Sequence, residues 1–517
     1  MQECPPSPVS PGRLTGIIGA GLLTVILVAT FAARADDVKP ETAPGSKLTA
    51  QRSSDFAPDP AYTGKDYDQA QQIEIYGGKT KVVAPRPMIE LGEPLYREGA
   101  LGQHYDVIGQ KNLFNPMFEI FGDWRSAVAY NNNGRGKEVG SIATRLNLET
   151  DLQFTATERL HALFRPLDQG GVFTHADLFG PNQKKDTLNL NGQVRTLFFE
   201  GDAGAMAAGF SDKYKNFDLP FSVGLTPMFF QNGIWANSAL LGGAFSIIGK
   251  NSPSLGISNM DVTFFAGFDD VTTPAIKADN ILVNHGLSVY GAAAFIEANE
   301  GYWEAGLGYL EDRRGLAFNN ASYGSATLAF TKRYFGWLSN STRGIATFGQ
   351  QNQANGQKTA DGFIFLMENS LITDQPLVLV PYLNAFVGVG HPQSLIRNAD
   401  AGGILFNSGI LFETDGLTGY PKLDDTAQNT YGAAIGVNYL FKFDQQIVLE
   451  AATVQVRHDN IAFATQQTTA LGDQYGFGAR YQRNLTSDLI FRADVMYAFR
   501  QNQDNIAGIR TELRLKF

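Results

Sequence analysis

The sequence predicts an all-β protein, a transmembrane antiparallel up-and-down β-barrel with an N-terminal extension. From about Asp123 onward, apolar and polar residues alternate with a period of two, as in strands with one apolar and one polar face. The composition includes 55 Gly and 12% aromatic residues but only 18% charged residues, with a mean hydropathy of −0.15. No run of roughly 18 apolar residues follows the N-terminal region, which excludes a bundle of membrane helices.

The alternation is clear in the last ten residues. Ile509, Leu513, Leu515 and Phe517 share one face, and every second residue from Arg510 to Lys516 is charged. A barrel in lipid needs this arrangement, with its apolar face outward and its polar face inward. The pattern resembles the closing strand of bacterial outer-membrane β-barrel proteins, which typically ends in Phe. The resemblance implies a porin-like barrel in the outer membrane of a Gram-negative cell, surrounded by lipid and lipopolysaccharide.

The N-terminus has the features of a secretory signal peptide. An apolar stretch from Ile17 to Ala32 follows Arg13, and Ala33-Arg34-Ala35 forms a small-residue cleavage site. We therefore expect residues 1–35 to be removed; the alternative is a single anchoring helix. The only cysteine, Cys4, lies in this segment, so no disulfide or thiol chemistry is expected in the mature chain.

Residues 36–115 form a separate region, rich in Pro, Lys, Asp and Gln, with weak alternation. We expect a periplasmic or plug-like extension. The sequence leaves open whether it stays in the periplasm, reaches the cell wall or enters the barrel.

The barrel is expected over residues 116–517. Its most regular predicted strands are Ala143 to Phe154, Tyr475 to Gln482 and Leu489 to Arg500. Eight turns are expected on the periplasmic rim, and with longer loops between them they give about 18 strands, within a range of 16 to 20. These turns are Ala156-Thr157, Asp202-Ala203, Asn251 to Ser258, Ala298 to Glu300, Ser339 to Ser341, Thr373 to Gln375, Asp444-Gln445 and Leu485 to Ser487.

Two segments are predicted to be outer loops, because counting either as one strand breaks the alternation of up and down strands. Residues 217–235 contain Pro220 and Pro227, which central strands do not tolerate. Residues 391–430 are predicted to be a large extracellular loop with room for a hairpin. Pro381 is expected to mark a bulge or a break in its strand.

A barrel of this size encloses a water-filled lumen unless something plugs it. The alternation directs a set of basic side chains inward, and closure of the barrel brings its early and late members onto one arc of wall. Such an arc favours anions, although the arginines can also pair with Glu149, Asp151, Asp494 and Glu512. The pore-lining candidates are Arg145, Arg165, Arg195, Arg480, Arg492, Arg500, Arg510, Arg514 and Lys516.

The segment 217–235 is apolar for an outer loop, and we expect it to fold inward and narrow the channel. The alternatives are a surface loop packed on the barrel rim or a pair of short strands. The constriction candidates are Phe217, Phe221, Phe229, Phe230 and Trp235.

No pattern of catalytic or metal-binding residues is found. The six histidines lack ligand spacing, and no G-x-S-x-G motif occurs. Asp415, Asp424 and Asp425 match no calcium loop. The net charge of −10 argues against nucleic-acid binding. We therefore expect no cofactor, no metal and no enzymatic activity.

Together these features favour an outer-membrane channel for passive diffusion of small hydrophilic solutes, with a preference for anions. One alternative is a plugged transporter of hydrophobic or bulky compounds. Another is an adhesin or enzyme mounted on the barrel. A homotrimer is left open, since porins often trimerise through their walls but no residue here identifies such a contact.

Overall fold

The strands pair antiparallel with their neighbours along the chain, and the last strand pairs with the first. All the residues that the structure describes belong to the same compact unit. The predicted signal peptide and most of the predicted extension lie outside them. This computed structural model describes residues 86–92, 104–134, 138–169, 172–180, 187–278, 281–314, 320–352, 358–375, 378–413, 417–441, 444–457 and 472–517.

Within the described residues the barrel has 18 strands, as predicted. In chain order they are β2 (Met117–Asn132), β3 (Glu138–Gln153), β4 (Arg159–Phe164) continued by β6 (Val172–Phe179), β7 (Val194–Asp202), β8 (Pro220–Phe230), β9 (Ala236–Ser252), β10 (Ile257–Asp269), β13 (Leu287–Ala298), β14 (Gly301–Asp312), β15 (Tyr323–Tyr334), β16 (Leu338–Phe348), β17 (Asp361–Leu371), β18 (Leu379–His391), β20 (Thr430–Phe441), β21 (Gln445–Val456), β22 (Gln474–Asn484), β23 (Leu489–Arg500) and β24 (Ile506–Lys516).

Shorter elements lie between or beside these strands. They are β1 (Ile89–Leu91), β5 (Asp168–Gln169), β11 (Lys277–Ala278), β12 (Ile281–Leu282), β19 (Ile396–Arg397), the helix α3 (Ala203–Ser211), and the 3-10 turns η4 (Pro253–Leu255) and η5 (Ala399–Ala401). No helix among the described residues is long and apolar enough to cross a membrane.

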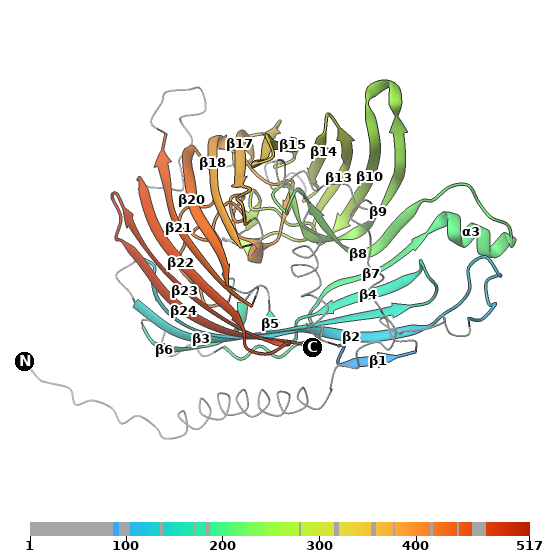
Figure 1. Ribbon diagram of the computed structural model, residues 1–517, viewed down its shortest axis with the longest axis horizontal. Helices are drawn as coiled ribbons and strands as arrows, with labels where there is room; N and C mark the ends of the chain where they lie inside the picture. The colour runs from blue at the N-terminus through green and yellow to red at the C-terminus, as the bar shows by residue number, and fades with distance from the viewer. Residues whose placement is uncertain are drawn as a thin grey trace, which may run out of the picture. The chain divides into compact units, whose positions relative to one another are not determined.

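Closure depends on the pairing of β24 with β2, which runs from Asp123 opposite Lys516 to Asn132 opposite Ala507 (Figure 1). The terminal Phe517 extends this pairing, because its backbone exchanges hydrogen bonds with that of Gly122. Beyond this point β1 pairs with the remaining residues of β2. A short part of the predicted extension therefore joins the sheet at the seam.

One barrel strand is interrupted. The strand β4 pairs with one half of β3, and β6 pairs with the other half. The chain between them makes the small β5–β6 hairpin, and β7 then pairs with β4. This interruption places Arg165 and Asp168 away from the regular ladder.

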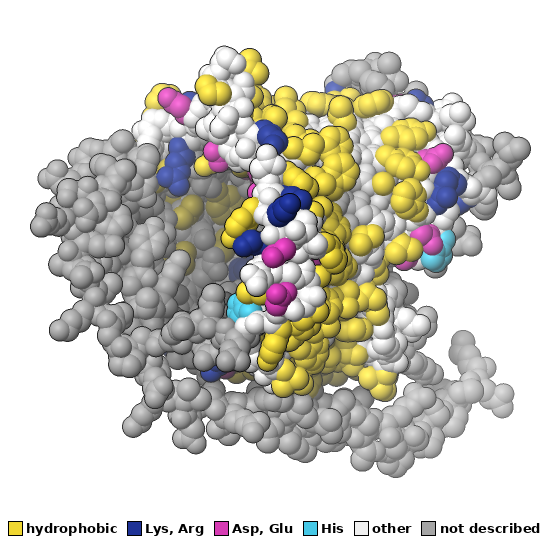
Figure 2. Space-filling model, turned by 90° about the vertical axis from the view of Figure 1, so that its right-hand side faces the viewer, with side chains coloured by type: hydrophobic (Ala, Val, Ile, Leu, Met, Phe, Trp, Pro, Cys, Tyr) yellow, Lys and Arg dark blue, Asp and Glu magenta, His cyan; other side chains and the backbone are white. Residues whose placement is uncertain are grey.

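The alternation predicted for the closing strand is confirmed. Ile509 is 58% exposed on the outside, whereas its neighbour Arg510 is 1% exposed on the inside. Apolar side chains are exposed in the same way along the other strands, and Figure 2 shows them covering much of one face of the barrel. Because most of the backbone of the wall is paired between neighbouring strands, this surface can lie in lipid.

The prediction that residues 217–235 form a loop is wrong, because β8 occupies most of the segment. Pro220 is the first residue of β8, and Pro227 lies beyond Leu225, the last residue of β8 that pairs with β7. Proline is tolerated at both kinds of position. The predicted turn at Asp202-Ala203 implied a strand before Phe217, but an alanine-rich helix, α3, is found there.

The helix α3 has a clear local cause. The Asp202 side chain caps it by accepting a hydrogen bond from the backbone N–H of Ala205 at 2.8 Å, and alanine is the strongest helix former. The strand number is unchanged, since β8 replaces the strand expected at the position of α3.

Other turns agree with the prediction to within a few residues, except that the turn expected at Ser339 to Ser341 lies at residues 335–337, between β15 and β16. Pro381 interrupts nothing: β18 continues through it and pairs with β20 without a register shift. The segment 391–429 is a connection, as predicted, but its described part contains no hairpin and folds into the barrel.

A charge on the outer face should destabilise the barrel. Ile435 is 60% exposed near the middle of β20, so Ile435→Lys is expected to lower the free energy of unfolding by about 2–4 kcal/mol. Urea-induced unfolding in lipid vesicles, followed by tryptophan fluorescence, measures this change. Asn438→Lys on the inner side of the same strand is the matched control and should cost much less; equal losses would contradict the assignment of faces.

Candidate functional site

The segment 391–429, which the structure describes at residues 391–413 and 417–429, crosses the inside of the barrel. It begins with β19, which pairs in parallel with the start of β9. It then approaches β4 and β7 through Asp400, reaches β22 and β23 through Glu413, and returns along β24. One connection therefore contacts both sides of the lumen.

Apolar packing holds this segment against the wall from β9 to β20. Leu395, Leu405 and Phe412 are buried there in one cluster with Trp235 and Tyr323. Such burial is the main source of stability in a protein interior. This packed cluster occupies part of the lumen.

Two glycines on the inner face of β14 permit this close packing. A Cβ atom at Gly306 would lie 2.7 Å from the ring of Trp235, and one at Gly308 would lie 2.3 Å from Leu395 Cδ2. Both distances are shorter than real contacts. The glycines therefore make room for the turn before β9 and for the infolded segment.

Arg397 fixes the segment to the turn between β8 and β9. Its guanidinium donates hydrogen bonds to Ser394 Oγ at 2.9 Å, to the Ala401 carbonyl at 3.0 Å and to the Gly233 carbonyl at 2.6 Å. Burial lowers the pKa of Arg397 to about 10, so the side chain remains charged at neutral pH. The buried charge is satisfied by oxygen atoms that are themselves part of the packed region.

Asp400 attaches the segment to the opposite wall. Its Oδ2 lies 2.6 Å from Arg165 Nη1 and 3.8 Å from Arg195 Nη2, and Arg195 also binds Asp168 at 2.7 Å. Burial raises the pKa of Asp400, but the charges of Arg165 and Arg195 outweigh it and lower the pKa below its ordinary value. The carboxylate is therefore ionised at neutral pH.

The remaining wall, from β22 through β24 to β2 and β3, is strongly polar. The strand register brings Arg125 of β2 opposite both Arg145 of β3 and Arg514 of β24. It also places Arg480, Asp494 and Arg510 side by side across β22, β23 and β24. The closing seam therefore lies in the middle of a basic arc.

Carboxylates separate these cations. Asp494 binds three arginines, at 2.7 Å (Arg480), 2.8 Å (Arg492) and 2.6 Å (Arg510). Glu512 binds Arg125 through two hydrogen bonds of 3.0 and 2.7 Å. This bidentate pair also crosses the seam, joining β24 to β2.

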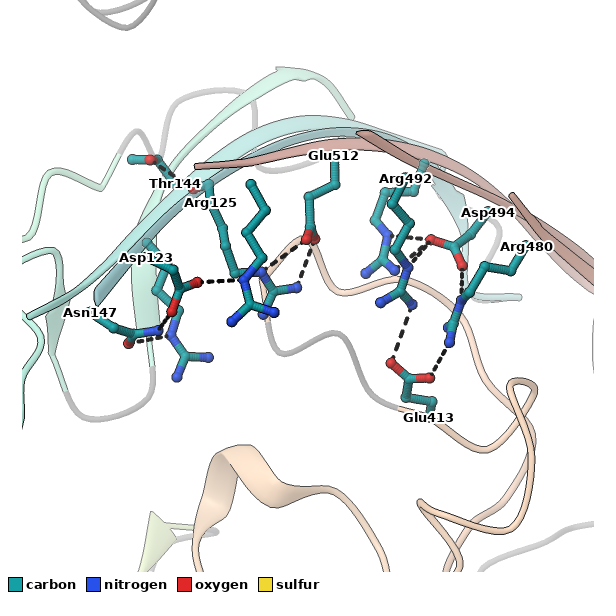
Figure 3. Close-up of polar contacts among 12 residues, drawn as sticks. Asp123, Arg125, Thr144, Asn147, Glu413, Arg480, Arg492, Asp494 and Glu512 are labelled. Carbon is teal, nitrogen blue, oxygen red and sulfur yellow. Dashed lines mark hydrogen bonds and ion pairs between the residues drawn. The ribbon is translucent and has the colours of Figure 1, made fainter. Parts of the chain in front are cut away.

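A cavity of about 320 Å³ lies between this wall and the infolded segment. In Figure 3 the arginines and carboxylates of the wall point toward the same space, and Glu413 approaches them from the opposite side. The lining consists of Arg125, Glu413, Gln482, Ile490, Arg492, Glu512, Arg514 and Lys516.

The cavity has a positive balance. Four of its lining side chains are basic and two are acidic, which leaves two positive charges in excess. Arg514 binds Asp123 at 2.9 Å, whereas Lys516 makes no ion pair with any residue that the structure describes. A cavity lined by more basic than acidic side chains favours a bound anion.

Comparison with known proteins supports the architecture. No protein-family model and no curated protein matches the chain. Among solved structures it is similar to Acinetobacter baumannii OccAB4, with a TM-score of 0.50 and 8% identity over 77% of this chain and 98% of that one. The chain has the fold of an outer-membrane porin. Pseudomonas aeruginosa OccK2 in complex with glucuronate (TM-score 0.47, 12% identity) and OpdK with vanillate (0.49, 11%) align over the same shares of both chains.

The porin fold agrees with the surface of the barrel. A closed, even-stranded antiparallel barrel with an apolar exterior and a polar interior is the form in which β-proteins cross the bacterial outer membrane. The protein is therefore located in the outer membrane, as the sequence indicated.

The structure brings together most of the predicted basic residues. Arg480, Arg492, Arg510, Arg514 and Lys516 lie on the arc described above. Three others lie on the same side of the porin, on or next to β3, β4 and β7: Arg145, Arg165 and Arg195. The exception is Arg500, which lies at the end of β23 and donates to the Asp504 carbonyl at 2.8 Å. Their role in lining a pore remains a prediction.

The predicted constriction residues do not form a loop. Phe221, Phe229 and Phe230 belong to β8, and Phe229 is exposed on its outer face. Phe217 precedes β8. Trp235 is buried inside the barrel, where its Nε1 donates to Ser325 Oγ at 3.0 Å. The segment that folds into the barrel is instead 391–429, which connects β18 to β20.

Several charged groups of the site were not predicted from the sequence. Arg125 and Asp123 stand two residues apart in β2 and follow the same alternation as the predicted strands, so this pattern identifies them. Asp400 and Glu413 lie in irregular chain, where no periodicity indicates which way a side chain points.

Asp494 should be essential for stability. In Asp494→Asn the buried Arg510 loses the carboxylate that its Nε and Nη2 bind, and the expected cost is roughly 3–5 kcal/mol. Urea unfolding in vesicles gives the value. Asp488→Asn, in the exposed turn before β23, is the control; a loss of under 1 kcal/mol in Asp494→Asn would contradict the role assigned to this network.

The attachment of the infolded segment should resist mild acid. Burial raises the pKa of Glu413, but Arg480 and Arg492 outweigh this and lower it below its ordinary value, as for Asp400. A carboxylate with a lowered pKa stabilises the folded state above its ordinary pKa and loses this effect as the pH falls through the folded value.

The effect of Glu413 on single-channel conductance, measured as the difference between the unmodified channel and Glu413→Gln, should therefore stay constant from pH 7 to about 5 and change only below roughly pH 4. A titration of this difference with a midpoint near pH 6 would contradict this assignment.

Proposed function

We propose that the protein is an outer-membrane channel for the diffusion of small hydrophilic solutes, with a preference for anions. The observation that carries this proposal is the cavity beside β22, β23, β24 and β2, where basic side chains outnumber acidic ones at the polar side of a partly filled lumen. The porin fold supports the channel, and the charge balance supports its selectivity.

The cavity has room for a small solute. A volume of about 320 Å³ holds about ten water molecules at the density of the liquid. A solute of a few carbon atoms with one or two negative groups fits such a space.

The alternatives draw less support from the described residues. An adhesin would need an exposed binding surface such as the large predicted loop 391–430, but many described residues of this segment are buried inside the barrel. A plugged transporter was expected to be closed by the extension, residues 36–115, most of which lies outside the described residues. The apolar packing against β9 to β20 belongs to the segment 391–429 instead. The adjoining charged cavity suits hydrophilic solutes better than hydrophobic ones.

Neutralising two of the four lining cations should remove the preference for anions. In the double variant Arg514→Gln and Lys516→Gln, the lining keeps two basic and two acidic side chains, so the anion-to-cation permeability ratio is expected to fall toward one. Reversal potentials across planar bilayers in a KCl gradient measure this ratio.

Arg483→Gln is the control, because Arg483 lies on β22 but outside the cavity. If the double variant keeps the full anion preference of the unmodified channel, the charged cavity does not determine selectivity.

A further inference from the structure

Two carboxylates of the infolded segment occupy arginine pairs on the barrel wall. Asp400 lies between Arg165 and Arg195, and Glu413 lies between Arg480 and Arg492. Each is in the position that the carboxylate of a small organic acid would take in an arginine site. Their surroundings differ, and the difference suggests separate roles.

Glu413 faces the cavity. Its side chain is 31% exposed; Oε2 lies 2.7 Å from Arg480 Nη1, and Oε1 lies 3.2 Å from Arg492 Nη2 (Figure 3). Each oxygen thus contacts a different arginine from an adjacent strand. Asp400 is less exposed, at 14%, and does not line the cavity.

The two arginines do not depend on Glu413 for their positions. Asp494 binds Arg480 Nε and Arg492 Nε from the wall. Glu413 binds only their outer Nη groups, which point into the lumen. If Glu413 leaves, both guanidiniums keep the Asp494 carboxylate. Arg492, which lines the cavity, then presents a freed N–H donor there, beside the freed donor of Arg480.

The chain before Glu413 is also held independently. The backbone N–H groups of Ile410 and Leu411 both donate to Glu450 of β21 at 2.9 Å, and Leu411 and Phe412 are buried. The Glu413 side chain can therefore change rotamer while the packed part of the segment stays in place.

From this geometry we propose that Glu413 is a tethered competitor for the channel's solute. Its carboxylate occupies the site in which the carboxylate of a small organic acid binds Arg480 and Arg492, and the solute enters by displacing it. This inference rests on the proposed anion channel and adds its ligand class and its regulation. A carboxylate, with two oxygens, replaces both contacts of Glu413, whereas chloride replaces them poorly.

The first test compares acetate currents in planar bilayers. In Glu413→Gln the competing charge is absent, and the acetate concentration that gives half-saturation is expected to fall at least roughly tenfold. Glu300→Gln, in the exposed turn between β13 and β14, should leave this concentration unchanged. An unchanged value in Glu413→Gln would overturn the proposal.

A second variant separates competition from net charge. Glu413→Asp keeps the negative charge but shortens the side chain by one methylene, so it should no longer reach both arginines. We expect its half-saturation to fall as in Glu413→Gln. If it matches the unmodified channel instead, the charge of the cavity and not occupation of the site determines acetate binding, and the proposal is wrong.

A reversible modification makes the comparison within one inserted channel, so folding does not affect it. In Glu413→Cys with Cys4→Ser, the sulfonate reagent methanethiosulfonate ethylsulfonate restores an anion at this position. Half-saturation should rise on modification and return after dithiothreitol. No change on modification would also overturn the proposal, whereas an unmodified channel without anion preference would refute the proposed function itself.

Discussion

The pairing of β24 with β2 is the interaction on which the rest of the structure depends. A sheet in lipid has no water to satisfy its edges, so every edge strand must find a partner. The last residues of the chain meet this requirement by pairing with β2, and β1 extends the pairing past Phe517. Closure also brings charges from the two ends of the chain into one place, since Arg125 and Glu512 pair across the seam.

The lumen that results has two unlike sides. From β9 to β20 much of the inner wall is apolar and packs against the segment 391–429, although the ion pair of Arg343 and Glu368 also faces inward there. From β22 through β24 to β4 it is polar and basic. The infolded segment contacts both sides. Its leucine and phenylalanine side chains pack against the apolar side, and its carboxylates Asp400 and Glu413 bind arginines on the basic side. The charged cavity lies on the second side.

The sequence was sufficient for the features that depend on alternation. The strand number, the direction of Arg510 and Ile509, and the meeting of early and late arginines all follow from a period of two in a closed barrel. The sequence-based predictions failed where the position of a residue within its strand mattered more than its type. Pro220 and Pro227 argued against a strand, but they occupy a strand start and an unpaired edge, which a sequence does not reveal.

The positions of Asp400 and Glu413 could not be predicted for a different reason. Their contacts join residues more than sixty positions apart, between irregular chain and the wall. Only tertiary packing determines which outer connection enters the barrel. The apolar residues of 404–412 indicate that this connection is buried, but the same pattern suggested a hairpin.

The measurement that tests the central claim most directly is the reversal potential of the unmodified protein in a planar bilayer with a KCl gradient. A passage along the basic side of the lumen predicts steady conductance and a potential whose sign shows that chloride crosses more readily than potassium. A cation preference, or a bilayer that stays sealed after insertion, would contradict it.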